Sequence, residues 1–216
     1  GVMDADLASL MQGDPEVIFI GGRLASSYDA LSEIAPVVYL SIDVETGVVK
    51  SVTKNAGTIA SIFGLEDEVK EKTAGFDERI EALAEKAKGH TALVGMTTSG
   101  SFNLMGNDGR CSIIGVEIGF DNLTAAESTS THGNEASFET VVEKNPEYIF
   151  VMDRDQAIGA DGAQTAKEIM ENELVMQTDA YKNGKIIYLE HPAVWYTAEG
   201  GITALDVMLS DLEESL

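Results

Sequence analysis

Short apolar segments alternate along this chain with longer segments of helical periodicity. The apolar segments are bounded by glycine, proline or polar residues, a pattern typical of strands that are covered on both faces of a parallel sheet. We predict strands at 17–20, 37–40, 91–98 and 185–189, with 101–106 as a hairpin or bulged partner of 91–98. Strands that alternate with helices indicate an α/β fold with mostly parallel sheets flanked by helices.

One of these patterns occurs twice. Residues 6–23 (DLASLMQGDPEVIFIGGR) and 137–154 (SFETVVEKNPEYIFVMDR) share a short helix, a proline-containing turn, a buried apolar strand and an arginine just after the strand. In open α/β sheets, ligands bind outside the carboxyl ends of the strands. The repeat therefore predicts two similar lobes that present Arg23 and Arg154 to a shared cleft.

The stretch between the two copies has the periodicity of helices. One apolar face ends at Gly64, and a second amphipathic helix is predicted over 66–88. A helix of that length extends about 34 Å, so we expect it to join the two lobes. The predicted organisation is a truncated N-terminal lobe at 1–64, an inter-lobe helix at 65–88 and a C-terminal lobe at 89–216.

The C-terminal half contains two segments without clear periodicity. Residues 121–136 read as a polar loop, and residues 191–201 (HPAVWYTAEGG) read as a second loop. Helices are predicted from about Gln164 onward and over Thr203–Leu212. Both loops lie where the walls of a cleft are expected.

The charge of the chain narrows the classes of partner. Its 216 residues carry a formal net charge of −23, which argues against nucleic acid or an anionic membrane surface as a partner. No apolar run approaches the roughly 20 residues of a membrane span. No export signal is recognisable, so we expect the chain to begin after any such signal. The single Cys111 excludes an intramolecular disulfide and leaves the compartment open.

The motifs of common enzymes are missing from the sequence. GGRLAS lacks the third glycine of a dinucleotide fingerprint, and neither a phosphate-binding P-loop nor a GxSxG nucleophile elbow occurs. HExxH, CxxC and paired acidic metal motifs are also missing. We therefore do not expect an enzyme.

A small set of cationic and aromatic residues stands out in so acidic a chain. Of the four arginines, Arg79 lies in a helical run, whereas Arg23, Arg110 and Arg154 all follow apolar strand-like segments. Each could simply pair with a nearby carboxylate. Alternatively, they suit an anionic, oxygen-rich aromatic ligand, which guanidinium groups bind through charge-assisted hydrogen bonds and stacking.

Two further side chains could bind a metal. His132 lies in a polar loop (STHG) and Tyr196 in a glycine-rich loop (WYTAEGG). A histidine in a polar loop is often merely solvated, and a tyrosine before a helix often only packs. A His nitrogen and a Tyr phenolate can, however, both ligate Fe(III), so the pair is a candidate iron site.

These residues resemble a known family. The runs STHG…SFETVVEKNPEYIFVMDRDQAIG and KNGKIIYLEHPAVWY are similar to the class III, helical-backbone substrate-binding proteins of iron-siderophore ABC importers. Within that family the chain looks most like the branch that binds ferric petrobactin and bis-catecholate siderophores. The resemblance covers essentially the whole chain, but the first segment of the family's N-terminal lobe is missing from it.

The resemblance implies a set of ligand-binding residues. Arg23, Arg110 and Arg154 match the family's three arginines, and Trp195 adjoins the site. His132 and Tyr196 match the residues that complete the iron shell when the siderophore supplies only four oxygens. Glu139, at a helix start in the second lobe, is a candidate for docking to the permease, although its counterpart in the first repeat is Ala8.

The resemblance also implies a function and a location. We expect an extracytoplasmic, monomeric binding protein, in the periplasm or as a cell-surface lipoprotein, that delivers a ferric siderophore to an ABC-transporter permease. Fe(III) would arrive as the chelate, with no intrinsic cofactor. Two alternatives remain open: the same fold with haem or a corrinoid as cargo, and an α/β enzyme fragment.

Overall fold

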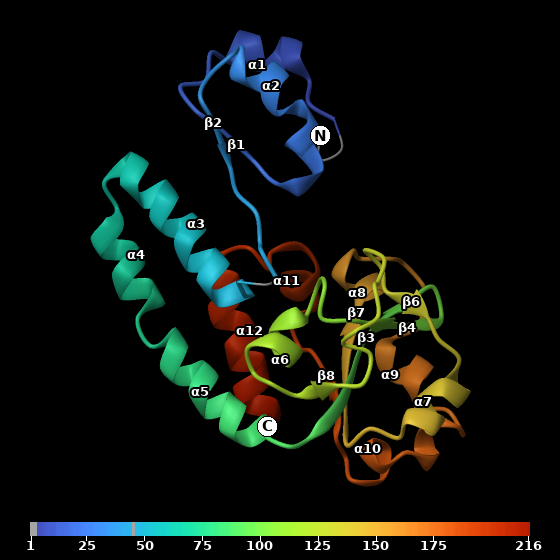
Figure 1. The fold of residues 1–216 in the computed structure, drawn as a ribbon. Coiled ribbons are helices and arrows are strands. Elements are labelled where there is room, and N and C mark those ends of the chain that lie inside the picture. The colour runs from blue at the N-terminus through green and yellow to red at the C-terminus, as the bar shows by residue number, and fades with distance from the viewer. Residues whose placement is uncertain (1–3, 45) are drawn as a thin grey trace. The chain divides into compact units, whose positions relative to one another are not determined.

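The structure is a computed structural model that describes residues 4–44 and 46–216. The chain divides into two units, residues 1–42 and 43–216, which are described separately below (Figure 1). This division differs from the boundary expected at residue 64. The helix that the sequence pattern assigned to the first lobe belongs to the second unit.

The first unit is a small α/β element built around two parallel strands. Its elements are α1 (Leu7–Gly13), β1 (Ile18–Ile20), the 3₁₀ helix η1 (Gly22–Ser27), α2 (Tyr28–Ser32) and β2 (Val37–Tyr39). The predicted strands at 17–20 and 37–40 are confirmed, and they pair in parallel with Ile18 opposite Val37. Asp6 caps α1 by accepting a hydrogen bond from the Ser9 N–H.

The second unit contains a six-stranded mixed sheet. Its strands are β3 (Thr91–Thr98), β4 (Ser101–Met105), β5 (Asp121–Asn122), β6 (Asn134–Glu135), β7 (Tyr148–Asp153) and β8 (Ile186–Tyr188). The order is β6-β4-β3-β7-β8, with β5 also pairing with β3. The β3–β7 and β7–β8 pairs are parallel, whereas β4 is the antiparallel hairpin partner of β3. The predicted strands and hairpin of this half are therefore confirmed.

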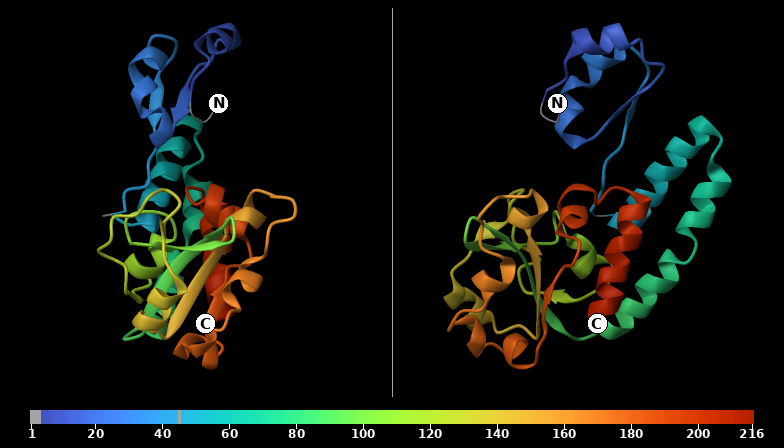
Figure 2. Two further views of the ribbon diagram at one scale, coloured as in Figure 1. Left: turned by 90° about the vertical axis from the view of Figure 1, so that its right-hand side faces the viewer. Right: turned by 180° about the vertical axis from the view of Figure 1, so that it is seen from behind.

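Helices cover both faces of this sheet (Figures 1 and 2). One side carries α3 (Val48–Phe63), α4 (Glu66–Thr73), α5 (Phe76–Ala87), α6 (Ser112–Val116) and α12 (Ile202–Ser215). The other side carries α7 (Phe138–Lys144), α9 (Ala166–Met170), η2 (Val175–Gln177) and α10 (Asp179–Lys182). Two short helices, α8 (Arg154–Ala157) and α11 (Pro192–Thr197), follow β7 and β8 at the carboxyl ends of these strands.

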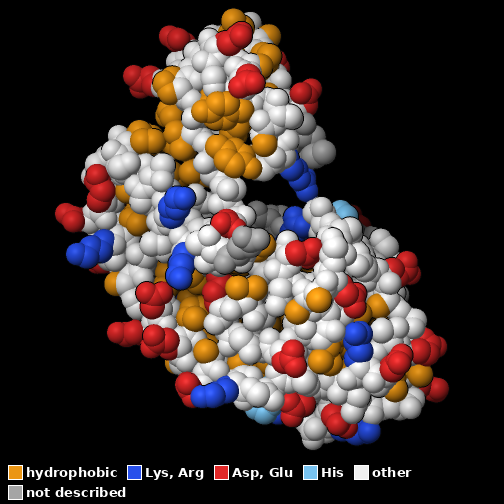
Figure 3. All heavy atoms as spheres, viewed as in Figure 1, with side chains coloured by type: hydrophobic (Ala, Val, Ile, Leu, Met, Phe, Trp, Pro, Cys, Tyr) orange, Lys and Arg blue, Asp and Glu red, His pale blue; other side chains and the backbone are white. Residues whose placement is uncertain are grey.

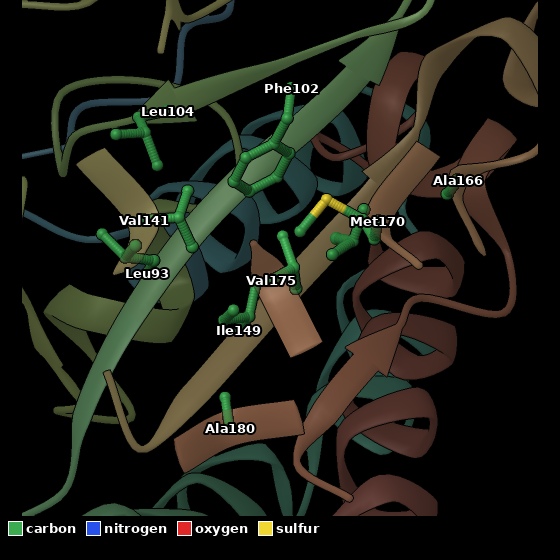
Figure 4. Packing of buried hydrophobic residues seen from close by; sticks show 10 residues of the cluster. Leu93, Phe102, Leu104, Val141, Ile149, Ala166, Met170, Val175 and Ala180 are labelled. Atoms are coloured by element: carbon green, nitrogen blue, oxygen red, sulfur yellow. The ribbon is translucent and has the colours of Figure 1, made fainter. Parts of the chain in front are cut away.

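An apolar core fills the space between the sheet and its second helical layer. Phe102 from β4 packs there with Met170 from α9, and Ile149 from β7 lies beside Val175 (Figure 4). All four of these side chains are almost completely buried. Burial of a large apolar side chain stabilises a fold by about 1.5–3 kcal/mol, so this layer fixes the position of β7 and of the loops that follow it.

The helix predicted over 66–88 is two helices. Ala74 has an extended backbone and Gly75 has φ +88°, so α4 ends at Thr73 and α5 begins at Phe76. Glycine adopts that left-handed conformation without the steric cost that a Cβ imposes. The apolar periodicity resumes after the break, which is why the sequence pattern concealed it.

The second segment predicted as a loop contains a helix. Residues 192–197 form α11, with Pro192 at its start, where a missing N–H costs nothing. Its buried residues, Pro192 and Trp195, are too few to give a periodic signal. The closing helix is also longer than predicted, since α12 runs from Ile202 to Ser215. Within 121–136, strands β5 and β6 add two short pairings to the predicted polar loop.

The helix predicted from about Gln164 begins at Ala166 and is held by a capping box. The Thr165 side chain accepts a hydrogen bond from the Glu168 N–H, and the Glu168 carboxylate accepts one from the Thr165 N–H. We expect Thr165→Ala to lower the free energy of unfolding by about 1 kcal/mol, measured by urea denaturation. Thr58→Ala, in the middle of α3, is the control. It should have no effect or stabilise slightly, because alanine has the higher helix propensity.

The surface reflects the composition of the chain. Acidic side chains are spread over the face shown in Figure 3 and outnumber the basic ones there. Among the described residues, no helix combines the length and the apolar character needed to cross a bilayer.

Candidate functional site

Four of the predicted site residues meet in the second unit. Arg110 lies in the turn before α6, His132 in the loop between β5 and β6, Arg154 at the start of α8, and Tyr196 in α11. They come from four separate segments of the chain, and the shared feature is contact with Tyr196. The sequence prediction that these residues act together is therefore consistent with their placement.

The Tyr196 ring is the centre of this cluster. The guanidinium carbon of Arg110 lies 4.5 Å from the ring centroid, and that of Arg154 lies 5.6 Å from it. Cations within about 6 Å of an aromatic ring are attracted by its quadrupole. The phenol is only half-buried, so its oxygen combines access from solvent with a strongly positive environment.

Three neighbouring side chains hold the Arg154 guanidinium. Its Nε donates to the phenol oxygen of Tyr196 at 3.1 Å, and its Nη1 donates to the Thr98 hydroxyl at 3.2 Å. Nη1 also lies 3.3 Å from the Asp155 carboxylate. The hydrogen bond to Tyr196 is the main cause that raises the pKa of Arg154, with a smaller contribution from Asp155. The charge at this position is therefore permanent, and the side chain is held in one orientation.

Asp155 is the residue that orients Arg154. Its carboxylate is buried and accepts a hydrogen bond from the Ser99 N–H at 2.6 Å, at the turn between β3 and β4. It therefore links that hairpin turn to the first turn of α8. Sequence reasoning missed this residue, although an acidic residue directly after an arginine at a strand end was the available signal.

Arg110 is held by backbone carbonyls. Its Nε donates to the Tyr196 carbonyl oxygen at 2.9 Å and its Nη1 to the Thr131 carbonyl oxygen at 2.7 Å. The following residue, Cys111, has φ +61°, a conformation that costs energy for a residue with a Cβ. The Cys111 N–H donates to the Glu199 carboxylate at 2.9 Å, which helps to maintain this turn.

His132 borders the other side of the phenol. Its Nδ1 lies 3.4 Å from the Tyr196 oxygen, and the two rings are stacked with an interplanar angle of 26°. The imidazole is exposed, while its backbone carbonyl accepts a hydrogen bond from the Asn103 side chain at 2.7 Å. The backbone of this loop is thus tied to β4, and the ring faces the phenol.

The structure corrects the expectation for Trp195. The indole is fully buried, and its Nε1 donates to the Asp211 carboxylate at 2.8 Å. Because neighbouring side chains of a helix point in different directions, Trp195 packs inward while Tyr196 faces the arginines. Trp195 is therefore a buried core residue next to the site, whose side chain offers no exposed surface for a ligand in this conformation.

The two other predicted residues, Arg23 and Glu139, lie in other elements of the chain. Arg23 lies in η1 of the first unit and is exposed, and Glu139 lies in the first turn of α7 and is exposed. Their predicted roles in ligand binding and permease docking stay predictions.

The site offers two metal-binding atoms and not a complete metal centre. Within residues 4–44 and 46–216, no group of three or more His, Cys, Asp or Glu side chains could hold an ion. The Tyr196 oxygen and a His132 nitrogen are neighbouring donors. Such a pair suits an iron ion that arrives with most of its ligands already in place. The cysteine is unsuited to nucleophilic chemistry, because burial raises the pKa of the Cys111 thiol well above its usual value.

Comparisons with known proteins agree with this picture. Residues 1–193 match the family described as "Periplasmic binding protein". The chain is 33% identical to the petrobactin-binding protein YclQ of Bacillus subtilis, covering 99% of this chain and 67% of that protein. It is 27% identical to the ferric-anguibactin-binding protein FatB of Vibrio anguillarum, covering 92% and 62% of the two chains.

Solved structures share the fold. The periplasmic catecholate-siderophore binding protein VctP of Vibrio cholerae matches with a TM-score of 0.90 and 29% identity, covering 100% of this chain and 77% of that one. The crystal structure of YclQ matches with a TM-score of 0.86 and 32% identity, covering 99% of this chain and 74% of that one. The chain thus spans about two thirds to three quarters of the length of these proteins.

Proposed function

Because this chain belongs to the periplasmic binding protein family, we propose that it is the substrate-binding component of an ABC importer that captures an anionic ferric catecholate siderophore. The named relatives support this proposal, since they bind petrobactin, ferric anguibactin or catecholate siderophores. The family consists of binding proteins, and the sequence lacks the motifs of common enzymes. A role without catalysis is therefore part of the proposal.

The observation that carries the proposal is the pair of guanidinium groups on Tyr196. Arg110 and Arg154 both lie within 6 Å of its ring in a chain whose net charge is −23. Placing two cations together is unfavourable; the Asp155 carboxylate offsets part of the charge of Arg154, and a bound anion would stabilise the pair further. Guanidinium groups also stack on aromatic rings and donate to oxygen anions, and a ferric catecholate offers both features in one ligand.

The same geometry suggests how the iron is held. Two catecholates supply four oxygens to Fe(III), which takes six ligands. The Tyr196 oxygen and a His132 nitrogen, on neighbouring side chains, would supply the remaining two. This arrangement favours siderophores that leave two positions free, while hexadentate chelates would use the arginines alone.

The remaining predictions extend this proposal. Arg23 of the first unit would supply a third guanidinium, and Glu139, exposed on α7, would contact the permease. We further propose that 1–64 and 89–216 act as lobes joined through 65–88, and that the mature protein is a monomer. It would work outside the cytoplasm, in the periplasm or as a lipoprotein on the cell surface.

A fluorescence titration tests the proposal. Trp195 is the only tryptophan and directly precedes Tyr196, so a ferric catecholate bound at Tyr196 should quench its emission by energy transfer. We expect saturable quenching of the full-length protein at micromolar or lower concentrations of a ferric bis-catecholate. The iron-free ligand serves as the control. Quenching by haem with a Soret band, and none by any ferric catecholate, would contradict the proposal and favour haem as cargo.

A further inference from the structure

The carboxylate that maintains the Arg110 turn is also an ionisable group next to the site. Glu199 follows α11 by two residues, and its Oε1 accepts the Cys111 N–H at 2.9 Å. Cys111 is the residue after Arg110, whose Nε donates to the Tyr196 carbonyl oxygen. Two hydrogen bonds therefore join the arginine turn to the C-terminal end of α11, and one of them ends on an ionisable group.

Charged groups of both signs act on Glu199. Among the described residues, the Arg110 charge lowers its pKa and the Glu117 charge raises it, while Lys50 acts in turn on Glu117 at the end of α6. One oxygen of Glu117 accepts the Val49 N–H at 3.0 Å, and the other is buried without a hydrogen-bond partner among the described residues. The thiol of Cys111 is buried and neutral.

Burial makes the Glu199 carboxylate titratable at neutral pH. Desolvation raises its pKa to about 7, against the opposing effects of the Cys111 hydrogen bond and the Arg110 charge, and the Glu117 charge raises it further. A protonated Glu199 still accepts the Cys111 N–H through its carbonyl oxygen. The turn can therefore keep its geometry while the charge behind Arg110 changes.

We propose that Glu199 couples ligand capture to the uptake of one proton, by becoming protonated when an anionic chelate binds at Arg110. The proton comes from solvent and converts the carboxylate to the carboxylic acid, with no other bond formed or broken. The proposal rests on the proposed function, because it needs an anion at Arg110. Its physical basis is repulsion between the anionic chelate and the Glu199 carboxylate, which is hydrogen-bonded to the turn that carries Arg110.

The direction of the pH dependence follows from linkage. If binding favours the protonated form of Glu199, protonation must favour binding by the same factor. Affinity is then highest below the pKa of Glu199 in the free protein, falls as the pH rises through that value, and levels off above its pKa in the complex. A tenfold loss of affinity corresponds to a rise in the pKa of Glu199 by about one on binding.

Calorimetry with a matched variant tests the proposal. Titrations with a ferric bis-catecholate at pH 7.5, in buffers of different ionisation enthalpy, report the number of protons taken up. We expect a fraction of a proton more for the native protein than for Glu199→Gln, and a ratio of their affinities that changes about tenfold between pH 6 and pH 9. Glutamine keeps an acceptor for the Cys111 N–H but cannot ionise. Glu190→Gln, which removes an exposed carboxylate nearby, should leave the uptake unchanged.

A measurement without ligand separates this inference from the proposed function. Carbon-13 NMR of the glutamate carboxyl groups, assigned through Glu199→Gln, should show Glu199 titrating near neutral pH in the free protein. Equal proton uptake by both proteins, or a Glu199 ionised throughout pH 5–8, would overturn the linkage and leave siderophore binding intact. No binding by either protein at any pH would overturn the proposed function and the linkage with it.

Discussion

Tyr196→Phe is expected to remove the visible absorption band that a phenolate–iron(III) bond produces in the ferric catecholate complex. The substitution deletes one atom, the oxygen that lies 3.1 Å from Arg154 Nε and 3.4 Å from His132 Nδ1. The ring remains and can still stack on Arg110. Loss of a charge-assisted interaction of this kind costs about 1.5–3 kcal/mol, so we expect affinity to fall by about 10–150-fold.

Tyr188→Phe is the matched control for this change. Tyr188 is a half-buried tyrosine of β8 that packs against the apolar core, and burial raises its pKa to about 12. Its removal should leave both the absorption band and the affinity unchanged. If the band instead survives in Tyr196→Phe, the iron is bound by the siderophore alone and Tyr196 only packs against it.

The contributions of His132 and Arg154 can be distinguished by the same two measurements, the absorption band and the affinity. Arg154 carries a fixed charge and is oriented by Asp155, so its loss is expected to lower the affinity for the proposed ligand without shifting the absorption band. If His132 ligates the iron as proposed, its loss is expected to change the iron coordination and therefore the absorption band. Ligation and charge neutralisation are thus different contributions of neighbouring residues, and spectra distinguish them where affinities alone do not.

The parts of the fold that the sequence predicted are those that a buried apolar run defines. Strands β1, β2, β3, β7 and β8 all correspond to apolar runs. In β3 and β7 the reason is burial on both faces, which requires apolar residues throughout, whereas β1 and β2 leave Phe19 and Tyr39 exposed. Elements stabilised by single contacts were missed. The break at Gly75 depends on one left-handed glycine, and α11 depends on one buried indole and its acceptor.

In the candidate site, too, the residues that follow a sequence pattern were predicted and those defined by a single contact were missed. Arg110, His132, Arg154 and Tyr196 were predicted because arginine, histidine and tyrosine at strand ends suit an anionic ferric ligand, and the family pattern contains them. Asp155 and Glu199 act through hydrogen bonds to backbone N–H groups of segments that are distant in sequence. For Asp155 the one signal was its position directly after Arg154, and for Glu199 no pattern in so acidic a chain distinguishes it from the carboxylates that face solvent.

Asp211 supports the helix that carries Tyr196. It is buried on α12 and accepts hydrogen bonds from Trp195 Nε1 at 2.8 Å, from the His191 N–H at 3.2 Å and from His191 Nδ1 at 2.6 Å. One carboxylate therefore anchors the N-terminal end of α11, the helix that presents Tyr196. The His191 ring itself is largely exposed, so much of the stabilisation comes from the buried indole and backbone donors.

Asp211→Ala is expected to lower the free energy of unfolding by about 2–4 kcal/mol, because it leaves the buried Trp195 N–H without an acceptor. For a chain of this size the melting temperature should fall by roughly 5–15 °C, measured by thermal denaturation. Asp206→Ala on the same helix is the control. Its ion pair with Arg79 is exposed, and its loss should cost less than about 1 kcal/mol.

The effect of Asp211→Ala should also depend on pH. The hydrogen bond to Asp211, and then its charge, raise the pKa of His191 in the folded protein. The pair therefore contributes fully below the unfolded histidine pKa of about 6.5, and its charge contribution is lost as the pH rises through the folded value. The difference in the free energy of unfolding between the native protein and Asp211→Ala should therefore become smaller as the pH rises through the folded pKa of His191. It should not reach zero, because the hydrogen bond from Trp195 does not titrate in this range. A difference that stays constant from pH 5 to pH 9 would show that the charge of His191 contributes nothing, and that the hydrogen bonds from the indole and the His191 backbone N–H hold α11 in place.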